Sequence, residues 1–343
     1  MDQTTQTEVT PEQLYEAMLA DYPDHADGTR PVHAVGIGAT GYFVPSTVAA
    51  RYSVAEQFAS GRVPVTIRFS NGTGSPQVRD GAQDVRGLAA KFHLPSGAEA
   101  DLIMITLPLF FAATPAGFLG FAVAGIPAAR RPESLAAGVR DAVGLRVPLP
   151  PADPEHPDGL AGVLAYADRD RTARPGTIAA LTLVTPTSYA RVTYHALHAF
   201  KMTDPEGVVR YGRFTWEPVA GVRPHPDLQP PDDYLRSELA ERLHRAPARF
   251  VLRMTVAEQG DPLDDPTKWW DTTRLRVVMG ELVVTDIAED QNAGCEKLSF
   301  NPTRVVPGFE CSDDPILAAR GRTYELSCRE RGGTGCPIGG ALL

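Results

Sequence analysis

The sequence predicts one α+β domain built around an antiparallel β-barrel of about eight strands, with helices around the barrel. Two observations indicate this fold. From residue 30 onward, short runs rich in β-branched and small residues alternate with Gly, Pro and Asp turns, which is typical of antiparallel barrels. No internal repeat or Gly/Ser linker divides the chain. The candidate strands are 31–43, 63–70, 86–93, 101–106, 190–202, 209–216, 248–257 and 275–286.

Helical patterns flank and interrupt these strands. Thr10 is followed by a proline and a glutamate, which indicates an N-cap and first turn and predicts a short helix through about Leu19. Prolines and charges in 145–175 predict an irregular surface excursion. The other helices are expected at 114–124, 133–143, 232–244 and 314–331. In domain terms, we expect an N-terminal helical arm (1–27), the main domain (28–331) and a loose tail (332–343).

Composition excludes several classes of protein. The 343 residues carry a formal charge of -9 and no Lys/Arg run, so nucleic-acid binding is not expected. The sequence contains no apolar stretch of about 18 residues, the length that would predict a membrane span. The polar N-terminus lacks a secretory signal, so we expect a cytoplasmic protein. In that compartment the cysteines, whose spacing fits no zinc site, are expected to be free thiols. They are Cys295, Cys311, Cys328 and Cys336.

The segment RGRTYELSCRER (320–331) carries the first candidate chemistry. If it is helical, Arg320 and Tyr324 lie on one face. A guanidinium beside a phenol favours the phenolate, a hard anionic ligand suited to ferric iron. Arg331 lies two turns beyond Tyr324 on the same face, where it could bind an anion. On this segment alone, a solvated basic helix with a packed tyrosine remains the alternative.

Two other segments carry isolated polar residues. His33 stands in an otherwise apolar run (30–43), and Arg68 and Ser70 alternate with apolar residues, so both point to one face of a strand. A buried arginine needs an anionic partner, and Ser70 could orient a histidine by a hydrogen bond. The alternatives are a core histidine and an internal ion pair between Arg68 and Asp84 or another carboxylate.

Together these segments resemble the haem-dependent catalases. The resemblance rests on VHAVGIGATGYF, IRFSNGTGS followed by DVRGLAAKF, and FNPTRVVPGFECSDDPILAARGRTY, with YHALHAFK and DPLDDPTKWW between them in the family's order. It covers roughly residues 28–331. The chain is shorter than a full catalase and is similar to the small catalase-related peroxidases and to catalase-like allene oxide synthases. Without the later segments of full catalases, bound NADPH is not expected.

The resemblance implies a cofactor and its ligand. Haem b would lie buried between the barrel and the last helix, with Tyr324 as the iron ligand and Arg320 stabilising its phenolate. His198 and Asp314 would be the hydrogen-bond partners behind that arginine. His33 would be the acid–base group on the opposite face of the haem.

Further residues match the family's cofactor contacts. Ser70 would orient His33, whereas His195 has no match and is expected to be structural. The residues implied to pair with the haem propionates are Arg30, Arg68 and Arg331. Those implied to make apolar contact with the porphyrin are Val32, Phe110 and Phe118.

One departure from the family bears on activity. In DLIMITLPLFF (101–111) the family's distal asparagine falls on Thr106, and its neighbours Ile105 and Leu107 offer no polar group. A short hydroxyl in place of a carboxamide, in a more apolar pocket, favours a peroxidase over an efficient catalase. We therefore expect reduction of hydrogen peroxide or organic hydroperoxides by a small organic donor, with weak catalase activity.

Three alternatives remain open at this point. One is a fatty-acid hydroperoxide isomerase or lyase, although Val32 stands where allene oxide synthases place threonine. The second is a dedicated biosynthetic haem oxidase, and the third is a haem carrier or sensor without turnover. The family's habit of assembling implies a homo-oligomer, by analogy only.

Overall fold

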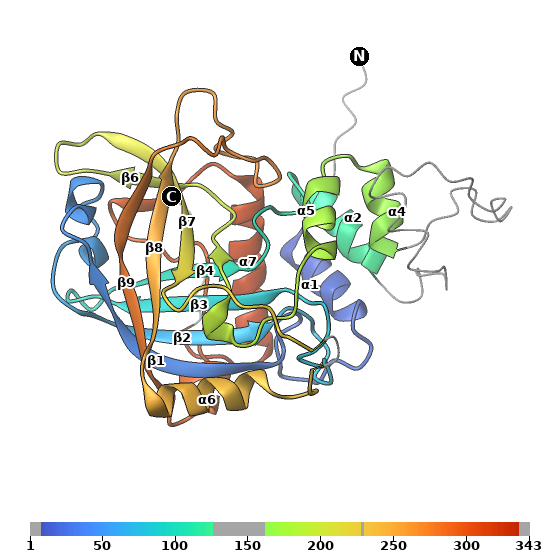
Figure 1. Cartoon of the computed structure of the whole chain (residues 1–343). Coiled ribbons are helices and arrows are strands. Elements are labelled where there is room, and N and C mark those ends of the chain that lie inside the picture. Colours follow the sequence, from blue (N-terminus) through green and yellow to red (C-terminus); the bar gives the residue numbers. More distant parts are fainter. Residues whose placement is uncertain (1–7, 126–161, 228–229, 336–343) are drawn as a thin grey trace, which may run out of the picture.

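The computed structural model describes residues 8–125, 162–227 and 230–335. Its centre is a closed antiparallel barrel in which β1, β2, β3, β4, β5, β7, β8 and β9 follow one another and β9 pairs back onto β1 (Figure 1). The strands of the barrel are β1 (Gly36–Pro45), β2 (Val63–Asn71), β3 (Arg86–His93), β4 (Glu99–Ile105), β5 (Tyr194–His195), β7 (Val209–Pro218), β8 (Ala248–Val256) and β9 (Arg276–Ile287). The predicted eight-stranded barrel is therefore confirmed.

Two short strands extend the sheet beyond the barrel. β6 (Phe200–Thr203) pairs with β7, and β10 (Phe309–Cys311) pairs with β6. The strand predicted over 190–202 is thus two strands, because the chain turns between β5 and β6 at Leu197, whose φ is 63°. This turn leaves His198 outside the sheet and free to contact the last helix.

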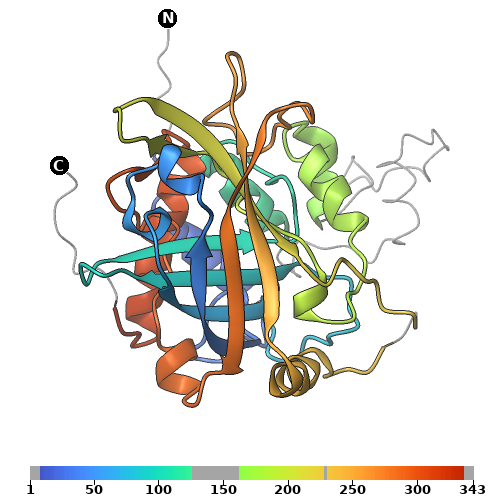
Figure 2. The same cartoon turned by 60° about the vertical axis from the view of Figure 1, so that its left-hand side comes forward.

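Six described helices surround the barrel (Figures 1 and 2). They are α1 (Pro11–Ala20), α2 (Pro115–Gly125), α4 (Gly162–Arg169), α5 (Arg174–Leu181), α6 (Leu235–Arg245) and α7 (Pro315–Glu330). The α1 start is as predicted, since Thr10 caps it through a reciprocal capping box with Gln13. α1 packs against both α2 and α7, so the N-terminal arm forms part of the wall around the functional site.

The segment 145–175 differs from its prediction where it is described. Residues from Gly162 onward form α4 and the start of α5 instead of an irregular excursion. Tyr166 explains part of this, because its hydroxyl donates to the Gly117 carbonyl at 3.0 Å and ties α4 to α2. The helix predicted at 133–143 lies outside the described residues.

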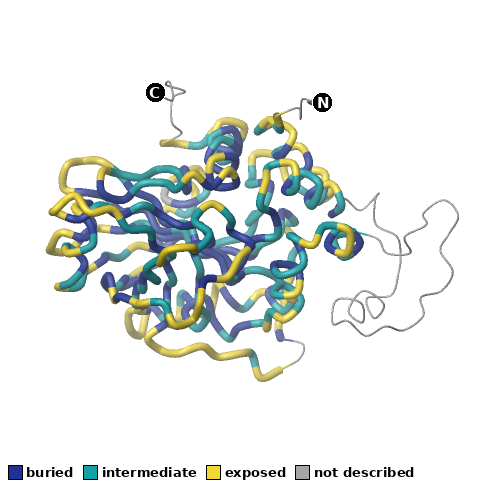
Figure 3. The backbone as a smooth tube through the Cα atoms, turned by 90° about the horizontal axis from the view of Figure 1, so that it is seen from above, coloured by how far each residue is buried: buried dark blue, intermediate teal, exposed yellow. Residues whose placement is uncertain are grey.

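The interior of the barrel is filled with aromatic and aliphatic side chains. Figure 3 colours the buried residues of the backbone dark blue. Phe43, Phe58, Phe214 and Trp216 meet there at ring-centroid distances of about 6 Å, the spacing of favourable edge and offset contacts. Because this interior is packed, a cofactor has to bind outside it. No helix in the described part of the chain is long and apolar enough to cross a bilayer.

The sequence had predicted that all the cysteines are free thiols, and this prediction is wrong for one of them. Cys295 and Cys311 are free, whereas Cys328 on α7 is disulfide-bonded. Cys336 lies outside the described residues.

Candidate haem site

A cavity of about 300 Å³ lies between the outer surface of the barrel and the helices α1, α2 and α7. Its walls come from the loop before β1, from β2, β3 and β4, and from the three helices. The predicted site residues that line it are Arg30, Val32, His33, Arg68, Ser70, Phe110, Phe118, Arg320, Tyr324 and Arg331. Segments almost 300 residues apart in the sequence thus meet around one space.

Tyr324 lies at the end of a chain of four polar side chains. Arg320 Nη2 donates to Tyr324 Oη at 3.2 Å, and Arg320 Nη1 contacts His198 Nε2 at 2.8 Å. His198 Nδ1 lies 2.6 Å from Asp314 Oδ2. Because arginine can only donate, Nε2 of His198 must accept, and its proton sits on Nδ1 facing Asp314. The chain therefore directs a positive group at the phenol.

The sequence explains why this series of hydrogen-bonded side chains is rigid. Asp314 is the N-cap of α7, and its Oδ1 accepts from the backbone N–H groups of Ile316 and Leu317. Its other oxygen holds His198, which burial and the neighbouring Arg320 give a pKa below its ordinary value despite Asp314. A neutral His198 is the form that can accept from Arg320.

His33 lies on the other side of the cavity and is held from behind. Its Nδ1 lies 2.9 Å from the Asn71 carbonyl oxygen and 3.0 Å from Ser70 Oγ. Because a carbonyl only accepts, Nδ1 carries the proton, and the lone pair lies on Nε2. A side chain on Gly87 would place its Cβ 2.7 Å from Ser70 Oγ and 3.1 Å from His33 Cε1, so only glycine leaves room for this pair.

The charge state and backbone of His33 are both unusual. Burial, and then the positive charge of Arg68, lower the pKa of His33 to about 3, so the ring is neutral near pH 7. Its φ of 59° is in the left-handed region, which non-glycine residues rarely occupy. This conformation explains why β1 begins at Gly36 and not at residue 31: the loop turns to place the imidazole at the cavity.

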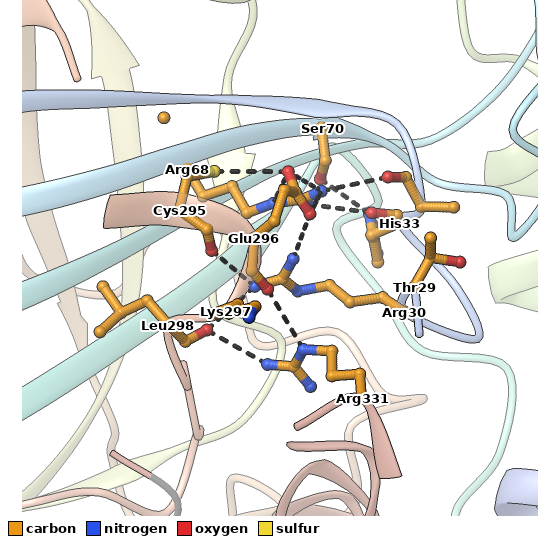
Figure 4. A network of polar contacts seen from close by, with 12 residues as sticks. Thr29, Arg30, His33, Arg68, Ser70, Cys295, Glu296, Lys297, Leu298 and Arg331 are labelled. Atoms are coloured by element: carbon orange, nitrogen blue, oxygen red, sulfur yellow. Dashed lines mark hydrogen bonds and ion pairs between the residues drawn. The ribbon is translucent and has the colours of Figure 1, made fainter. Parts of the chain in front are cut away.

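Three guanidinium groups gather at one edge of the cavity near Glu296 (Figure 4): Arg30 and Arg68 bind its carboxylate, and Arg331 donates to its backbone carbonyl. We call Arg30, Arg68, Arg331 and Glu296 the arginine cluster. Arg68 therefore has an internal ion pair, as one sequence-level alternative allowed, but its partner is not Asp84, which pairs with Arg86 at 3.3 Å. The cluster nevertheless keeps an excess of two positive charges.

The residues present fit a haem. The excess of two positive charges in the arginine cluster matches the two carboxylates of protoporphyrin. The phenol faces the cavity with a guanidinium beside it, and the apolar wall suits a porphyrin ring. Phe110 and Phe118 meet there edge to face at 5.2 Å. Phe111 and Phe121 also line the wall and were not singled out from the sequence.

Thr106 does not line this cavity, which corrects the sequence-based placement. Its Oγ1 accepts from the backbone N–H of Arg86 at 3.0 Å, and its own N–H donates to the Arg86 carbonyl at 2.9 Å. The residues of this segment that line the cavity are Ile103, Met104, Ile105 and Leu107, and all four are apolar. This part of the cavity wall is therefore apolar and offers no hydroxyl group.

Glu296 was also missed by sequence reasoning. It lies in the polar run AEDQNAGCEK, in which nothing distinguishes it from a solvated surface glutamate. Its partners Arg30 and Arg68 are more than 200 residues away. The one sequence signal that points to Glu296 is indirect: a buried arginine requires an anionic partner somewhere in the chain.

Comparisons with known proteins identify the family of this chain. The family model for catalase matches residues 10–134 and 169–336. The chain belongs to the catalase family. A catalase-related peroxidase of Mycolicibacterium paratuberculosis is 33% identical over 95% of this chain and 96% of its own length. A second, from Synechococcus elongatus, is 30% identical over 95% of this chain and 89% of its own length. The predicted small catalase-related type is thereby confirmed.

Solved catalases share the fold at low identity. A fungal catalase superposes with a TM-score of 0.71 at 22% identity, covering 91% of this chain and 62% of that structure. Catalase A of Saccharomyces cerevisiae gives a TM-score of 0.70 at 21% identity, covering 91% of this chain and 64% of that one. The chain thus spans less than two thirds of these full catalases, and the likeness concerns the fold.

Proposed function

We propose that this protein is a haem b-dependent peroxidase that reduces hydrogen peroxide or organic hydroperoxides with a small organic electron donor and has weak catalase activity. The observation that carries the proposal is the pairing, across one cavity, of an arginine-supported phenol, Tyr324, with a neutral histidine, His33. Membership of the catalase family and the two catalase-related peroxidases similar over nearly full length support it.

Tyr324, on this proposal, holds the haem iron as a phenolate. Arg320 Nη2 stabilises the negative charge on Oη by donating to it. Because His198 accepts from Arg320 and is itself held by Asp314, the guanidinium cannot turn away from the phenol. When bound, the haem supplies the redox chemistry that cleaves the peroxide O–O bond.

His33 moves the proton in this reaction. Its neutral Nε2 accepts the proton of the incoming peroxide and returns it to the leaving oxygen, while Nδ1 stays bonded to Asn71 and Ser70. One hydroperoxide, two electrons from the organic donor and two protons then give one alcohol, or water from hydrogen peroxide, and one further water. The pKa of about 3 keeps Nε2 available as a base at all physiological pH values.

The apolar wall supports an organic co-substrate. A catalase must hold a second hydrogen peroxide molecule, and Ile103, Ile105 and Leu107 offer it no hydrogen bond. The apolar part of an organic donor or of an alkyl hydroperoxide needs no hydrogen bond from this wall. Its burial there is favourable, at about 25 cal/mol per Å² of apolar surface. This is the basis for expecting weak oxygen evolution.

The test is stopped-flow spectroscopy of the haem-loaded protein with hydrogen peroxide and with cumene hydroperoxide, followed by dye oxidation and oxygen evolution. We expect both peroxides to change the haem spectrum, a phenolic dye to restore it, and little oxygen to form. Vigorous oxygen release with weak dye oxidation would make the protein a small true catalase. Conversion of a fatty-acid hydroperoxide without use of a donor would favour the isomerase or lyase.

A further inference from the structure

The arginine cluster already contains one negative charge, and the structure shows how closely it is held. Arg30 Nη1 donates to Glu296 Oε2 at 2.6 Å. Arg68 donates to the same carboxylate three times, from Nε to Oε1 at 3.3 Å and from Nη2 to Oε1 and Oε2 at 3.1 and 3.2 Å. Figure 4 shows the carboxylate of Glu296 between these two guanidinium groups. Every carboxylate oxygen thus receives charge-assisted bonds, the stronger kind.

The backbone delivers Glu296 to this position. Its N–H donates to the Gln291 carbonyl at 3.0 Å, and the Gln291 side chain bonds both the N–H and the carbonyl of Gly38 on β1, at 2.7 and 2.9 Å. A Cβ on Gly38 would lie 2.5 Å from Cys295 Cβ, so the turn Asn292–Glu296 rests directly on the strand. The carboxylate is therefore fixed by the barrel and does not depend on a flexible loop.

One carboxylate leaves the cluster short of negative charge. Arg331 contacts the carbonyls of Glu296 and Leu298 at 3.3 and 3.1 Å and Ser327 Oγ at 3.2 Å, but no carboxylate touches its guanidinium within the described residues. Burial and repulsion from Arg68 and Arg331 hold the pKa of Arg30 well below its ordinary value. The same two effects, with Arg68 as the repelling charge, lower the pKa of Arg331 to about 10.

We propose that Glu296 is a built-in counter-ion of the propionate site, which shares Arg30 and Arg68 with the carboxylates of the bound haem. This inference rests on the proposed haem function. Glu296 acts as a positioning residue: its charge holds two buried guanidinium groups at the cavity edge when no other anion is present. It has a further link to the site, because Arg68 Nη1 also donates to the His33 carbonyl at 2.9 Å.

The proposal predicts competition between two sources of negative charge. If Glu296 and the haem carboxylates share the same guanidinium groups, removing the charge of Glu296 increases the contribution of the haem carboxylates to binding affinity. Removing an arginine decreases this contribution. The two substitutions should therefore change the preference for charged haem in opposite directions, which a merely structural role of Glu296 would not do.

The experiment compares haem with its dimethyl ester, which has the same ring and iron but no propionate charge. Dissociation constants of both are measured by absorbance titration of the full-length chain. In the Glu296→Gln variant we expect the preference for haem over the ester to rise about tenfold, or about 1.4 kcal/mol. In Arg68→Gln the preference should fall by a similar factor. Glu281→Gln is the matched control, because Glu281 pairs with Arg249 on the barrel at 2.6 Å, away from the cavity.

The outcomes separate the two levels of proposal. An unchanged or lower preference in Glu296→Gln, in a parent that prefers haem, overturns the counter-ion and leaves the proposed function intact. A Glu296→Gln chain that fails to fold even with haem also overturns it, since the carboxylate is then required by the fold itself. A parent that binds haem and ester equally well removes the propionate assignment, and with it this inference.

Discussion

The two sides of the cavity are built on different physical principles. On the Tyr324 side, Asp314, His198 and Arg320 form a continuous chain of charge-assisted hydrogen bonds with distances of 2.6, 2.8 and 3.2 Å. On the His33 side there is one neutral imidazole, and the residues of β4 that line the cavity are apolar: Ile103, Met104 and Ile105.

On the proposed function, the Tyr324 side would hold the cofactor and the His33 side would determine the reaction type. The Tyr324 side is a coupled network, in which removing one member leaves another buried group unpaired at a cost of several kcal/mol. The His33 side has few polar partners, so single side chains there can be exchanged at low cost to stability. We therefore expect cofactor retention to fail on the first side and reaction type to change on the second.

The largest effect is expected from Tyr324→Phe, which removes the proposed ligand and leaves Arg320 without the phenol oxygen. The purified variant should lose most of its haem, by about tenfold or more, because no other phenol, thiol or carboxylate of α7 lines the cavity. The measurement is the haem-to-protein ratio together with the ferric spectrum. A variant that keeps the parental spectrum would show that another residue binds the iron.

His33→Asn should act on the other side of the cavity without affecting iron ligation. Asparagine tolerates the positive φ of this position, so the backbone can stay as it is. The reaction with hydrogen peroxide should slow by about 100-fold or more, the usual scale for a positioned acid–base group, while the resting spectrum is unchanged. His195→Asn is the control, since His195 is a half-buried histidine that does not line this cavity. Equal rates in parent and His33→Asn would mean that water moves the proton.

A carboxamide at position 105, on the wall of the cavity that His33 also lines, should shift the reaction toward oxygen evolution. An oriented donor at a reacting centre can contribute about 2.7–4 kcal/mol, and an unoptimised one less, so Ile105→Asn should raise oxygen evolution relative to dye oxidation by about tenfold. Thr106→Val is the control: it removes the acceptor of the Arg86 N–H and should cost about 1–3 kcal/mol of stability. Its ratio of activities should equal the parent's. A larger ratio in Thr106→Val than in Ile105→Asn would return Thr106 to the site.

The smallest effect is on stability at acid pH. His33 has a pKa of about 3 when folded and about 6.5 when unfolded, so between these values the unfolded chain binds one more proton than the folded one. Stability is therefore unaffected by His33 above about pH 6.5 and falls as the pH drops toward 3. In His33→Asn the slope of unfolding free energy against pH in this window should decrease by about one proton. Denaturant titrations from pH 4 to 7 measure it, and identical slopes would contradict burial of a neutral ring.

Several properties of this protein are local and could be read from its sequence. Short apolar runs split by Gly, Pro and Asp turns predicted the barrel, and Thr10 followed by Pro11 and Glu12 marked the start of α1. The spacing of Arg320 and Tyr324 placed both on one helix face, because a helix repeats every 3.6 residues. The motif order identified the family, since several motifs in one order are specific where a single one is not.

Other properties depend on distance in space between residues far apart in the chain, and only the tertiary structure decided them. A shift of one residue along a strand changes which side chains point to a given face, so Ile105 lines the cavity and Thr106 does not. The left-handed turn at Leu197 splits one expected strand and releases His198 toward Asp314. Glu296 has no direct sequence signal, because its role comes from two arginines more than 200 residues away whose buried charges need an anion.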